Sequence, residues 1–361
     1  MKILWLTNIP SPYRVDFFNE LGKLCDLTVL FERKSSDERD ISWNNFSTEN
    51  FKAIFLKGKN IGSAEAFCPS VITFLDRKYD HIVITNFSDP TGIFAILALR
   101  IKGIPYELES DGAFPGIGTG AKESIKRYFI AGAERYFSTA KLNDQYYVLY
   151  GAKEDRIIRY PFTSLFDRDV LSEPVSLDKK LALRNKLGIT EKKIVLAVGQ
   201  FITRKGFDIL IKSSVYLDDS YGFYIVGGKP TQEYMDMTCG KKNIHFVGFK
   251  ETYELKHYYQ AADVFVHPTR EDIWGLVINE AMANALPVVT TERCVAGLEM
   301  IEQGETGYIV PVEDEISLAL AIKKCLQFKD KSKILEKARQ YTLEKMAIRH
   351  IAVWKDLSKG S

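Results

Sequence analysis

The chain has 361 residues, with 49 basic against 47 acidic side chains and a net charge of +2. This balance gives no polybasic signature, so nucleic acid is not an expected partner. Hydrophobic residues make up 46% and charged residues 27% of the chain, a composition typical of a globular protein long enough for two domains.

The cysteines, the histidines and the most apolar run indicate the cellular compartment and whether a metal site is expected. The five cysteines lie far apart without a CxxC pair, which indicates reduced thiols in a cytoplasm. The histidines form no HExxH or HxH pair, so no metal site is expected. The most apolar run, residues 92–99, is far shorter than the about 20 residues that span a bilayer. We therefore expect a cytoplasmic protein, which would meet a membrane, if at all, from its surface.

The first half of the chain alternates short apolar runs with helical stretches. Strands are expected at 2–6, 26–31, 81–85 and 105–108, and helices at 13–23 and 92–102. Such alternation predicts a parallel sheet covered by helices on both faces.

A basic amphipathic helix is expected at residues 121–136, after a glycine-rich loop at 116–120. Four basic residues are interleaved with apolar ones along this helix: Lys122, Lys126, Arg127 and Arg135. Such a helix could touch the anionic inner surface of a membrane. The other interpretation is a helix that faces the core and has one solvated side.

The pattern restarts in the second half. Strands are expected at 193–198, 222–226, 245–247, 264–267 and 287–290, and helices at 207–215, 253–261 and 277–283. The irregular, polar segment 161–178 separates the two patterns, so the domain boundary belongs there. Residues 332–354 read as one helix that crosses back onto the first domain. The expected domains are 1–165, 166–335 and this C-terminal helix at 336–361.

The segment HPTREDIWGLVINEAMANALPVV, residues 267–289, carries the strongest functional signal. An apolar strand ends at Pro268, and a loop with Glu271 and Asp272 leads to Gly275, where a helix begins. The free N–H groups at a helix N-terminus suit a diphosphate. Asp272 and Glu280 are eight residues apart, which places one in the loop and the other inside the helix.

A second segment, VGQFITRKGFD at residues 198–208, runs from a strand through a glycine turn into a helix. Its turn holds Arg204 and Lys205. Fixed cations of this kind stabilise the negative charge that grows on a departing diphosphate.

These two segments resemble those of glycosyltransferase family 4, a group of retaining enzymes. The family pattern is an acid, seven residues, then Glu and AMAxGxPVV, and Asp272 stands where its first acid is usually Glu. Lys205-Gly206 match the GRxxxxKG pattern, but Gln200 stands where that pattern has Arg. The resemblance implies an α/β architecture of the GT-B type, in which two Rossmann-like domains with parallel sheets face each other across a cleft. It also implies that the second domain binds a nucleotide-sugar donor and the first an acceptor.

The resemblance implies a set of site residues. The expected catalytic residues are Asp111, Arg204, Lys205, Asp272 and Glu280. The expected donor-binding residues are Gly199, Gln200, Gly227, Gly228, Val247, Phe249, Glu271, Ile273, Trp274, Gly275, Leu276, Val277 and Glu299. Tyr13, Arg14, Glu109 and Gly112 are expected around the acceptor. No cofactor is expected beyond the donor itself.

Asp111 occupies the place where many family members have a histidine that points at the donor sugar. An acid there could polarise a hydroxyl or shield an oxocarbenium-like transition state, but it could equally be an ordinary turn acid before Gly112.

The sequence thus predicts a metal-independent, retaining transfer of a sugar from a UDP- or GDP-linked donor to a glycan or lipid-linked glycan in polysaccharide biosynthesis. Two alternatives stay open: a nucleotide-sugar epimerase or hydrolase on the same fold, and a degenerate donor-binding partner subunit without turnover.

Overall fold

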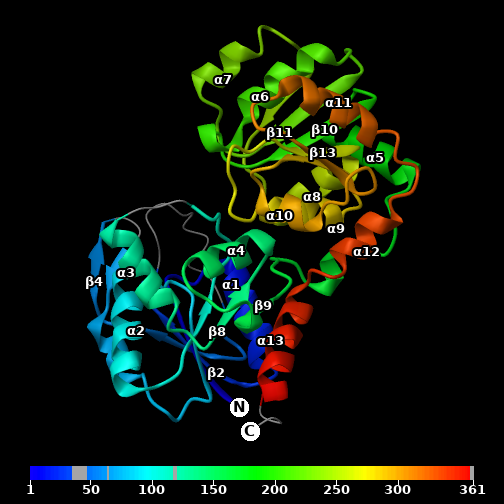
Figure 1. Cartoon of the computed structure of the whole chain (residues 1–361). Coiled ribbons are helices and arrows are strands. Elements are labelled where there is room, and N and C mark those ends of the chain that lie inside the picture. Colours follow the sequence, from blue (N-terminus) through cyan, green and yellow to red (C-terminus); the bar gives the residue numbers. More distant parts are fainter. Residues whose placement is uncertain (35–46, 63–64, 117–119, 358–361) are drawn as a thin grey trace. The chain divides into compact units, whose positions relative to one another are not determined.

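The computed structural model describes residues 1–34, 47–62, 65–116 and 120–357. The chain divides into two compact units, Met1–Ser164 with Thr342–Ser361, and Leu165–Tyr341 (Figure 1). Part of the expected glycine-rich loop, residues 117–119, lies outside the described residues. Within the described ranges, no helix is both long and apolar enough to cross a bilayer.

The described residues of the first unit form a seven-stranded parallel sheet in the order β3-β2-β1-β6-β7-β8-β9. Its strands are β1 (Lys2–Thr7), β2 (Asp26–Phe31), β3 (Lys52–Phe55), β6 (His81–Ile84), β7 (Glu107–Glu109), β8 (Arg135–Ser138) and β9 (Ile157–Arg159). A separate antiparallel pair is formed by β4 (Lys59–Ile61) and β5 (Glu65–Phe67). The central strands are nearly continuous apolar runs because both faces of the sheet are buried.

Helices cover both faces of this sheet. They are α1 (Pro12–Gly22), α2 (Pro90–Lys102), α3 (Ala121–Ile130), α4 (Lys141–Leu149) and α13 (Leu343–Leu357), with short 3₁₀ turns η2 (Pro69–Thr73) and η3 (Glu154–Arg156). Trp5 of β1 packs edge-on against Phe17 and Phe18 of α1 and against Trp354 of α13. The opposite face carries a core formed by Leu4, Leu99 and their neighbours. The last helix is therefore part of the first unit's core.

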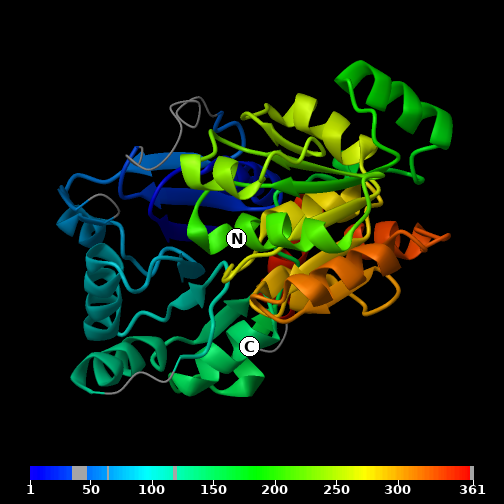
Figure 2. The ribbon, with the colours of Figure 1, turned by 90° about the horizontal axis from the view of Figure 1, so that it is seen from above.

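The second unit has a six-stranded parallel sheet in the order β12-β11-β10-β13-β14-β15. The strands are β10 (Lys193–Val198), β11 (Tyr221–Val226), β12 (Ile244–Val247), β13 (Val264–His267), β14 (Val288–Thr291) and β15 (Gly307–Val310). The helices are α5 (Leu177–Leu187), α6 (Phe207–Ser213), α7 (Gln232–Met237), α8 (Thr252–Ala261), α9 (Leu276–Ala283), α10 (Val295–Met300), α11 (Glu315–Cys325) and α12 (Ser332–Ala338), and the 3₁₀ turns are η4 (Asp167–Asp169), η5 (Thr203–Lys205) and η6 (Ser214–Tyr216). The alternation of strand and helix in this unit can be followed from green to orange in Figures 1 and 2.

The single helix expected at 332–354 is wrong, because the structure has two helices there. α12 packs on α9 in the second unit, and α13 packs on α1 in the first. The change of unit falls between Tyr341 and Thr342, six residues after the boundary drawn from the sequence. Tyr341 stays in the second unit because its ring packs against Trp274.

The helix expected at 121–136 is also too long. α3 ends at Ile130, and Arg135 opens strand β8 instead, where its guanidinium pairs with Glu107 at 3.0 Å. Gly132 allows this close turn, since a Cβ there would lie 2.5 Å from the guanidinium of Arg100. Lys126 is also taken up within the unit, because its ammonium lies over the Tyr150 ring. The basic face is therefore smaller than the sequence pattern indicated.

Replacing Trp354 tests how much the first unit depends on α13. The Trp354 ring is buried, stacks on His81, and its indole N–H donates to Glu107 at 2.8 Å. Truncation of such a side chain costs about 3–5 kcal/mol. We therefore expect Trp354→Ala to lower the free energy of unfolding by that amount in urea titrations followed by far-UV circular dichroism. Ile348→Ala, at a 57% exposed position of the same helix, should change it by less than about 0.5 kcal/mol. Equal losses would contradict this role.

Candidate active site

The two segments that carry the sequence motifs meet at the carboxyl edge of the second sheet. β10 and β13 are neighbours, but the strand that follows β10 in the chain, β11, lies toward one edge of the sheet, and the strand that follows β13, β14, lies toward the other. The strand order therefore reverses between β10 and β13, which makes this the topological switch point. Ligands of open α/β sheets bind outside the carboxyl ends of the strands at such a point. The η5 turn follows β10, and the loop with Asp272 follows β13.

A buried ion pair joins these two segments. The Lys205 ammonium lies 2.6 Å from Oδ2 of Asp272, and both side chains are at least 85% buried. The same carboxylate oxygen accepts a hydrogen bond from Nε2 of His267 at 3.0 Å. Arg204 lies further out, 3.7 Å from the other oxygen. Asp272 therefore holds Lys205 in place at the switch point.

The charges of this cluster are fixed by its surroundings. Burial alone would raise the pKa of Asp272, but the hydrogen bond from His267 and the Lys205 charge hold it well below its ordinary value. Burial, aided by the charge of Lys205, lowers the pKa of His267 although Asp272 opposes this. At neutral pH the carboxylate of Asp272 is thus charged and the imidazole of His267 is neutral.

Arg270 fixes the loop that carries Asp272. Its guanidinium forms a two-pronged pair with Asp208 at 2.8 and 2.7 Å and also pairs with Glu313. It donates to the carbonyl of Thr203 in η5, and its own N–H donates to the Arg204 carbonyl at 2.8 Å. The η5 turn and the Asp272 loop are therefore held together by Arg270.

The outer side of the same loop is more exposed. Glu271 pairs with Arg293, and both side chains are more than 40% exposed. Arg204 donates to the Glu271 carbonyl at 2.8 Å. Ile273 is 50% exposed. Glu271 and Arg204 thus lie where a bound molecule could reach them.

Two glycines let backbone segments approach each other here. Gly275 has φ of 105°, a left-handed conformation, at the N-cap of α9. A Cβ on Gly227 would lie 1.9 Å from the Gly199 carbonyl, so the ends of β10 and β11 touch through their backbones. Gly228 follows, and Gln200 is exposed beside it.

Helix α9 brings the second acid to the site. Glu280 is partly buried and accepts a hydrogen bond from the Tyr259 hydroxyl at 2.8 Å, and burial raises the pKa of its carboxyl. Leu276 and Val277, in the first turn, are partly exposed. Trp274 is 2% exposed, and its indole N–H donates to Asn279 at 2.9 Å. The Trp274 side chain is therefore part of the core, and only its backbone can face a ligand.

Three predicted donor residues lie further out along the same edge. Val247 ends β12, and its carbonyl accepts the Gly227 N–H at 3.0 Å. Phe249 is 65% exposed. Glu299 lies in α10, which follows β14, and is partly exposed.

The first unit has a charge cluster at the carboxyl edge of its own sheet. Arg14 is buried and pairs with both Glu109 and Asp111, and the Tyr13 hydroxyl donates to Asp111 at 2.9 Å. The structure thus brings four of the predicted residues of this unit into direct contact. Gly112 follows Asp111 directly, and its N–H donates to the Ser110 hydroxyl.

The two acids of this cluster differ in their protonation. Burial would raise the pKa of Glu109, but Arg14 and the imidazole of His350 hold it below its ordinary value. Burial raises the pKa of Asp111 although Arg14 opposes this, and the neighbouring Glu109 charge adds to the rise. Asp111 is therefore the acid of the pair that binds a proton more readily.

Several residues at these sites carried no signal in the sequence. Arg270 directly precedes the motif acids but looks like any loop arginine. Tyr259, Tyr160 and His350 come from distant segments; the Tyr160 hydroxyl donates to Glu109 at 3.0 Å, and His350 lies 3.4 Å from the same carboxylate. His267, at the end of β13, is fully buried and contacts Asp272.

The fold is that of GT-B glycosyltransferases, with one Rossmann-like sheet in each unit. The Anabaena protein Alr3699/HepE, crystallised in complex with UDP, aligns over 99% of this chain and 100% of its own with a TM-score of 0.73 and 17% identity. Residues 179–342 match the family model described as glycosyl transferases group 1. This match lies almost entirely within the second unit.

Two curated relatives illustrate the match. An uncharacterised glycosyltransferase of Haemophilus influenzae is 29% identical over 48% of this chain and 51% of its own length. The N,N'-diacetylbacillosaminyl-diphospho-undecaprenol alpha-1,3-N-acetylgalactosaminyltransferase of Campylobacter jejuni is 24% identical over 77% of each chain. For several other curated relatives, the match spans less than half of their length.

Acid titration tests the ion pair of Asp272. Because its pKa is lower in the folded chain than the about 3.9 of an unfolded one, its contribution is complete above that pH and is lost as the pH falls below it. Wild type should exceed Asp272→Asn by about 3 kcal/mol between pH 5 and 7, and this difference should shrink below about pH 4. Urea titrations at each pH measure it. A difference that stays constant to pH 2 would contradict the ion pair.

Hydrogen exchange tests the part played by Arg270. We expect Arg270→Gln to speed amide exchange in residues 203–206 and 269–272, since it removes the contacts that join these segments. Mass spectrometry of peptides covering the segments measures this. The matched control, Arg293→Gln, breaks the more exposed pair with Glu271 and should leave residues 203–206 unchanged. If both variants affected residues 203–206 alike, Arg270 would have no special role.

Proposed function

We propose that the chain is a retaining hexosyltransferase that moves a sugar from a UDP- or GDP-linked donor to a glycan or lipid-linked glycan in polysaccharide biosynthesis. The observation that supports it best is the position of Lys205 and Arg204. Both cations lie at the switch point of the second unit, next to the loop that leads into α9. A donor diphosphate in this place would meet two positive side chains and a helix N-terminus.

The proposed chemistry is charge stabilisation of the leaving group. As the bond between the sugar and the diphosphate breaks, negative charge grows on the phosphate oxygen, and Lys205 and Arg204 stabilise it without needing a metal ion. That oxygen accepts the proton of the acceptor hydroxyl on the same face of the sugar. Asp272 keeps the Lys205 ammonium oriented, since its carboxylate lies 2.6 Å away.

Glu280 is proposed to recognise the donor's ribose. Its carboxyl lies inside α9 with one oxygen taken by Tyr259, which leaves the other to accept from a ribose hydroxyl. Gly227 and Gly228, at the end of β11, leave room for a nucleotide close to the backbone.

The first unit is proposed to hold the acceptor. Asp111 lies at the carboxyl edge of its sheet, and 25% of its side chain is exposed. With a pKa raised by burial, it can donate to or accept from a sugar hydroxyl. The names of the compared proteins support the proposed classes of substrate: one relative is named for transfer to a diphospho-undecaprenol-linked sugar, and HepE was crystallised with UDP. Peripheral contact with the inner face of a membrane, through the exposed Arg127 and Tyr128 of α3, belongs to the same proposal.

Ligand-dependent unfolding tests the donor site. A nucleotide at 100 times its dissociation constant stabilises the fold by about 2.7 kcal/mol. We expect UDP or GDP, or one of their sugars, to raise the Tm of the wild-type chain. Lys205→Ala and Glu280→Ala should lose this shift, because they remove the diphosphate and ribose contacts. Lys333→Ala is the control, since it breaks the exposed pair with Glu305 in the same unit, and it should keep the shift.

Turnover then separates the proposal from its alternatives. A glycosyltransferase releases nucleotide together with a glycosylated acceptor, and the product keeps the donor's anomeric configuration. Nucleotide release with free sugar as the only product would indicate a hydrolase, and conversion of the donor into an isomeric nucleotide sugar would indicate an epimerase. Binding without any product would indicate a donor-binding partner subunit, for which Gln200 in place of the family's Arg is the supporting feature. Absence of a shift with every nucleotide would overturn the donor site itself.

A further inference from the structure

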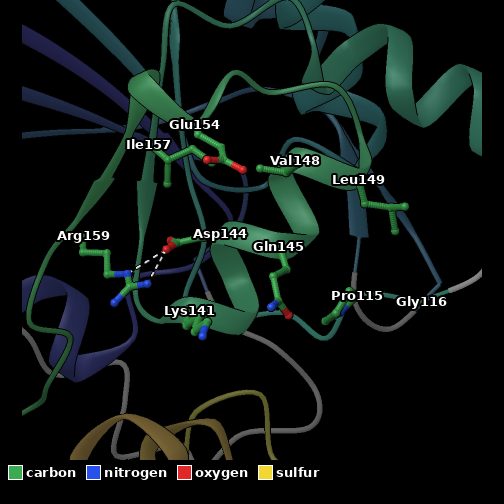
Figure 3. A pocket seen from close by; sticks show the side chains of 10 residues that line it. All are labelled: Pro115, Gly116, Lys141, Asp144, Gln145, Val148, Leu149, Glu154, Ile157 and Arg159. Carbon is green, nitrogen blue, oxygen red and sulfur yellow. Dashed lines mark hydrogen bonds and ion pairs between the residues drawn. The ribbon is translucent and has the colours of Figure 1, made fainter.

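A groove in the first unit is lined by none of the predicted catalytic, donor-binding or acceptor residues. It has a volume of about 730 Å³, which is within the range of small-molecule sites. Figure 3 shows its walls, which come from α4, from β9 with the turn before it, and from the segment after β7. The lining residues are Pro115, Gly116, Lys141, Asp144, Gln145, Val148, Leu149, Glu154, Ile157 and Arg159.

The groove begins at the functional edge of the sheet. α4 starts three residues after β8 ends, so Lys141 lies near the carboxyl end of that strand, and Arg159 is the last residue of the neighbouring β9. Asp111 follows β7, the strand that pairs with β8 on the side opposite to β9. From Lys141 the groove follows α4 to Leu149, a length of about 12 Å at the helical rise. One end therefore lies at the edge where the acceptor is proposed to react, and the other lies about 12 Å back along α4.

The polarity of the lining changes along this length. At the carboxyl edge, the Arg159 guanidinium pairs with Oδ2 of Asp144 at 2.7 Å, and Gln145 lies one residue further along α4 (Figure 3). The other oxygen of Asp144 is buried and accepts no hydrogen bond. A ligand in the groove would instead meet the exposed guanidinium of Arg159 and the exposed amide of Gln145, and both groups can form hydrogen bonds with hydroxyls. This end suits the hydroxyl groups of a sugar.

The far end is mostly apolar. Val148 and Leu149 are 38% and 39% exposed, and Ile157 of β9 lines the groove between α4 and the sheet edge. Glu154 is the charged residue at this end. When another apolar group covers solvent-exposed aliphatic side chains along a groove, apolar surface leaves water and the free energy of binding becomes more favourable.

We infer that this groove binds an acceptor made of a sugar joined to an aliphatic chain, with the sugar at Arg159 and Gln145 and the chain along Val148 and Leu149. The inference rests on the proposed function, and it selects the lipid-linked class among the acceptors named there. A free glycan would leave the apolar end uncovered.

Calorimetric titration of the full chain with two glucosides tests the inference. Methyl β-D-glucopyranoside offers the sugar alone, and octyl β-D-glucopyranoside, kept below its micellar concentration, adds the chain. Each buried methylene strengthens binding about fourfold, so we expect octyl glucoside to bind at least about tenfold more tightly. Equal affinities would overturn the inference.

Variants locate the binding. Leu149→Asp should remove most of the advantage of octyl over methyl glucoside, since it places a charge on the apolar wall. The control is Ile101→Asp on α2, where the side chain is 86% exposed and lies outside the groove. If Ile101→Asp removed the tighter binding of octyl glucoside and Leu149→Asp did not, the alkyl chain would bind outside the groove, and the inference would be wrong.

This test does not depend on turnover. If the wild-type protein bound octyl glucoside but no nucleotide, the proposed function would be overturned, and the groove would remain a site for amphipathic glycosides. Donor binding and sugar transfer that show no preference for an alkyl acceptor would overturn the inference alone.

Discussion

The ion pair between Lys205 and Asp272 is the interaction on which the second unit's functional edge depends. It joins the turn after β10 to the loop after β13, the two strands that flank the switch point. Burying two opposite charges costs desolvation that their attraction recovers only when further hydrogen bonds support them. His267 gives that support to the side chain, while the Asp272 N–H donates to the Arg293 carbonyl and its carbonyl accepts from Val295. The start of α10 is thereby tied to the same point.

The first unit also has buried charges at the carboxyl edge of its sheet, but their signs are arranged in the opposite way. There a single cation, Arg14, lies between two acids, whereas in the second unit one acid, Asp272, gathers a lysine and a nearby arginine. The edge of the second unit therefore presents excess positive charge, which suits a phosphorylated ligand. The edge of the first unit presents a carboxyl that readily binds a proton, which suits hydroxyl groups.

The sequence predicted the elements whose residues repeat a local pattern. The strands at Lys193–Val198 and Val264–His267 were found with the correct bounds because each is an unbroken apolar run. The end of α3 at Ile130 was missed because the residues after it still fit a helical pattern, and only the packing of Arg100 and Glu107 stops it. β9, three residues long, gave too short a pattern to detect.

The candidate sites divide in the same way. Asp272, Lys205 and Glu280 belong to contiguous motifs and could be named from the sequence. Arg270 could not be singled out, because its importance comes from pairing with Asp208, 62 residues away. His350 reaches Glu109 across 241 residues, a distance that only the folded chain closes.

The return of α13 to the first unit also affects how the protein is made. A ribosome delivers residues 1–164 before the second unit, but their unit lacks Trp354 and His350 until α13 has been translated. The second unit, Leu165–Tyr341, is continuous in the chain and has all its core residues earlier. Nascent chains fold as their segments emerge, so the first unit must wait with the buried face of α1 uncovered. A premature stop between Leu343 and Trp354 would therefore damage the unit whose first 164 residues had been synthesised earliest.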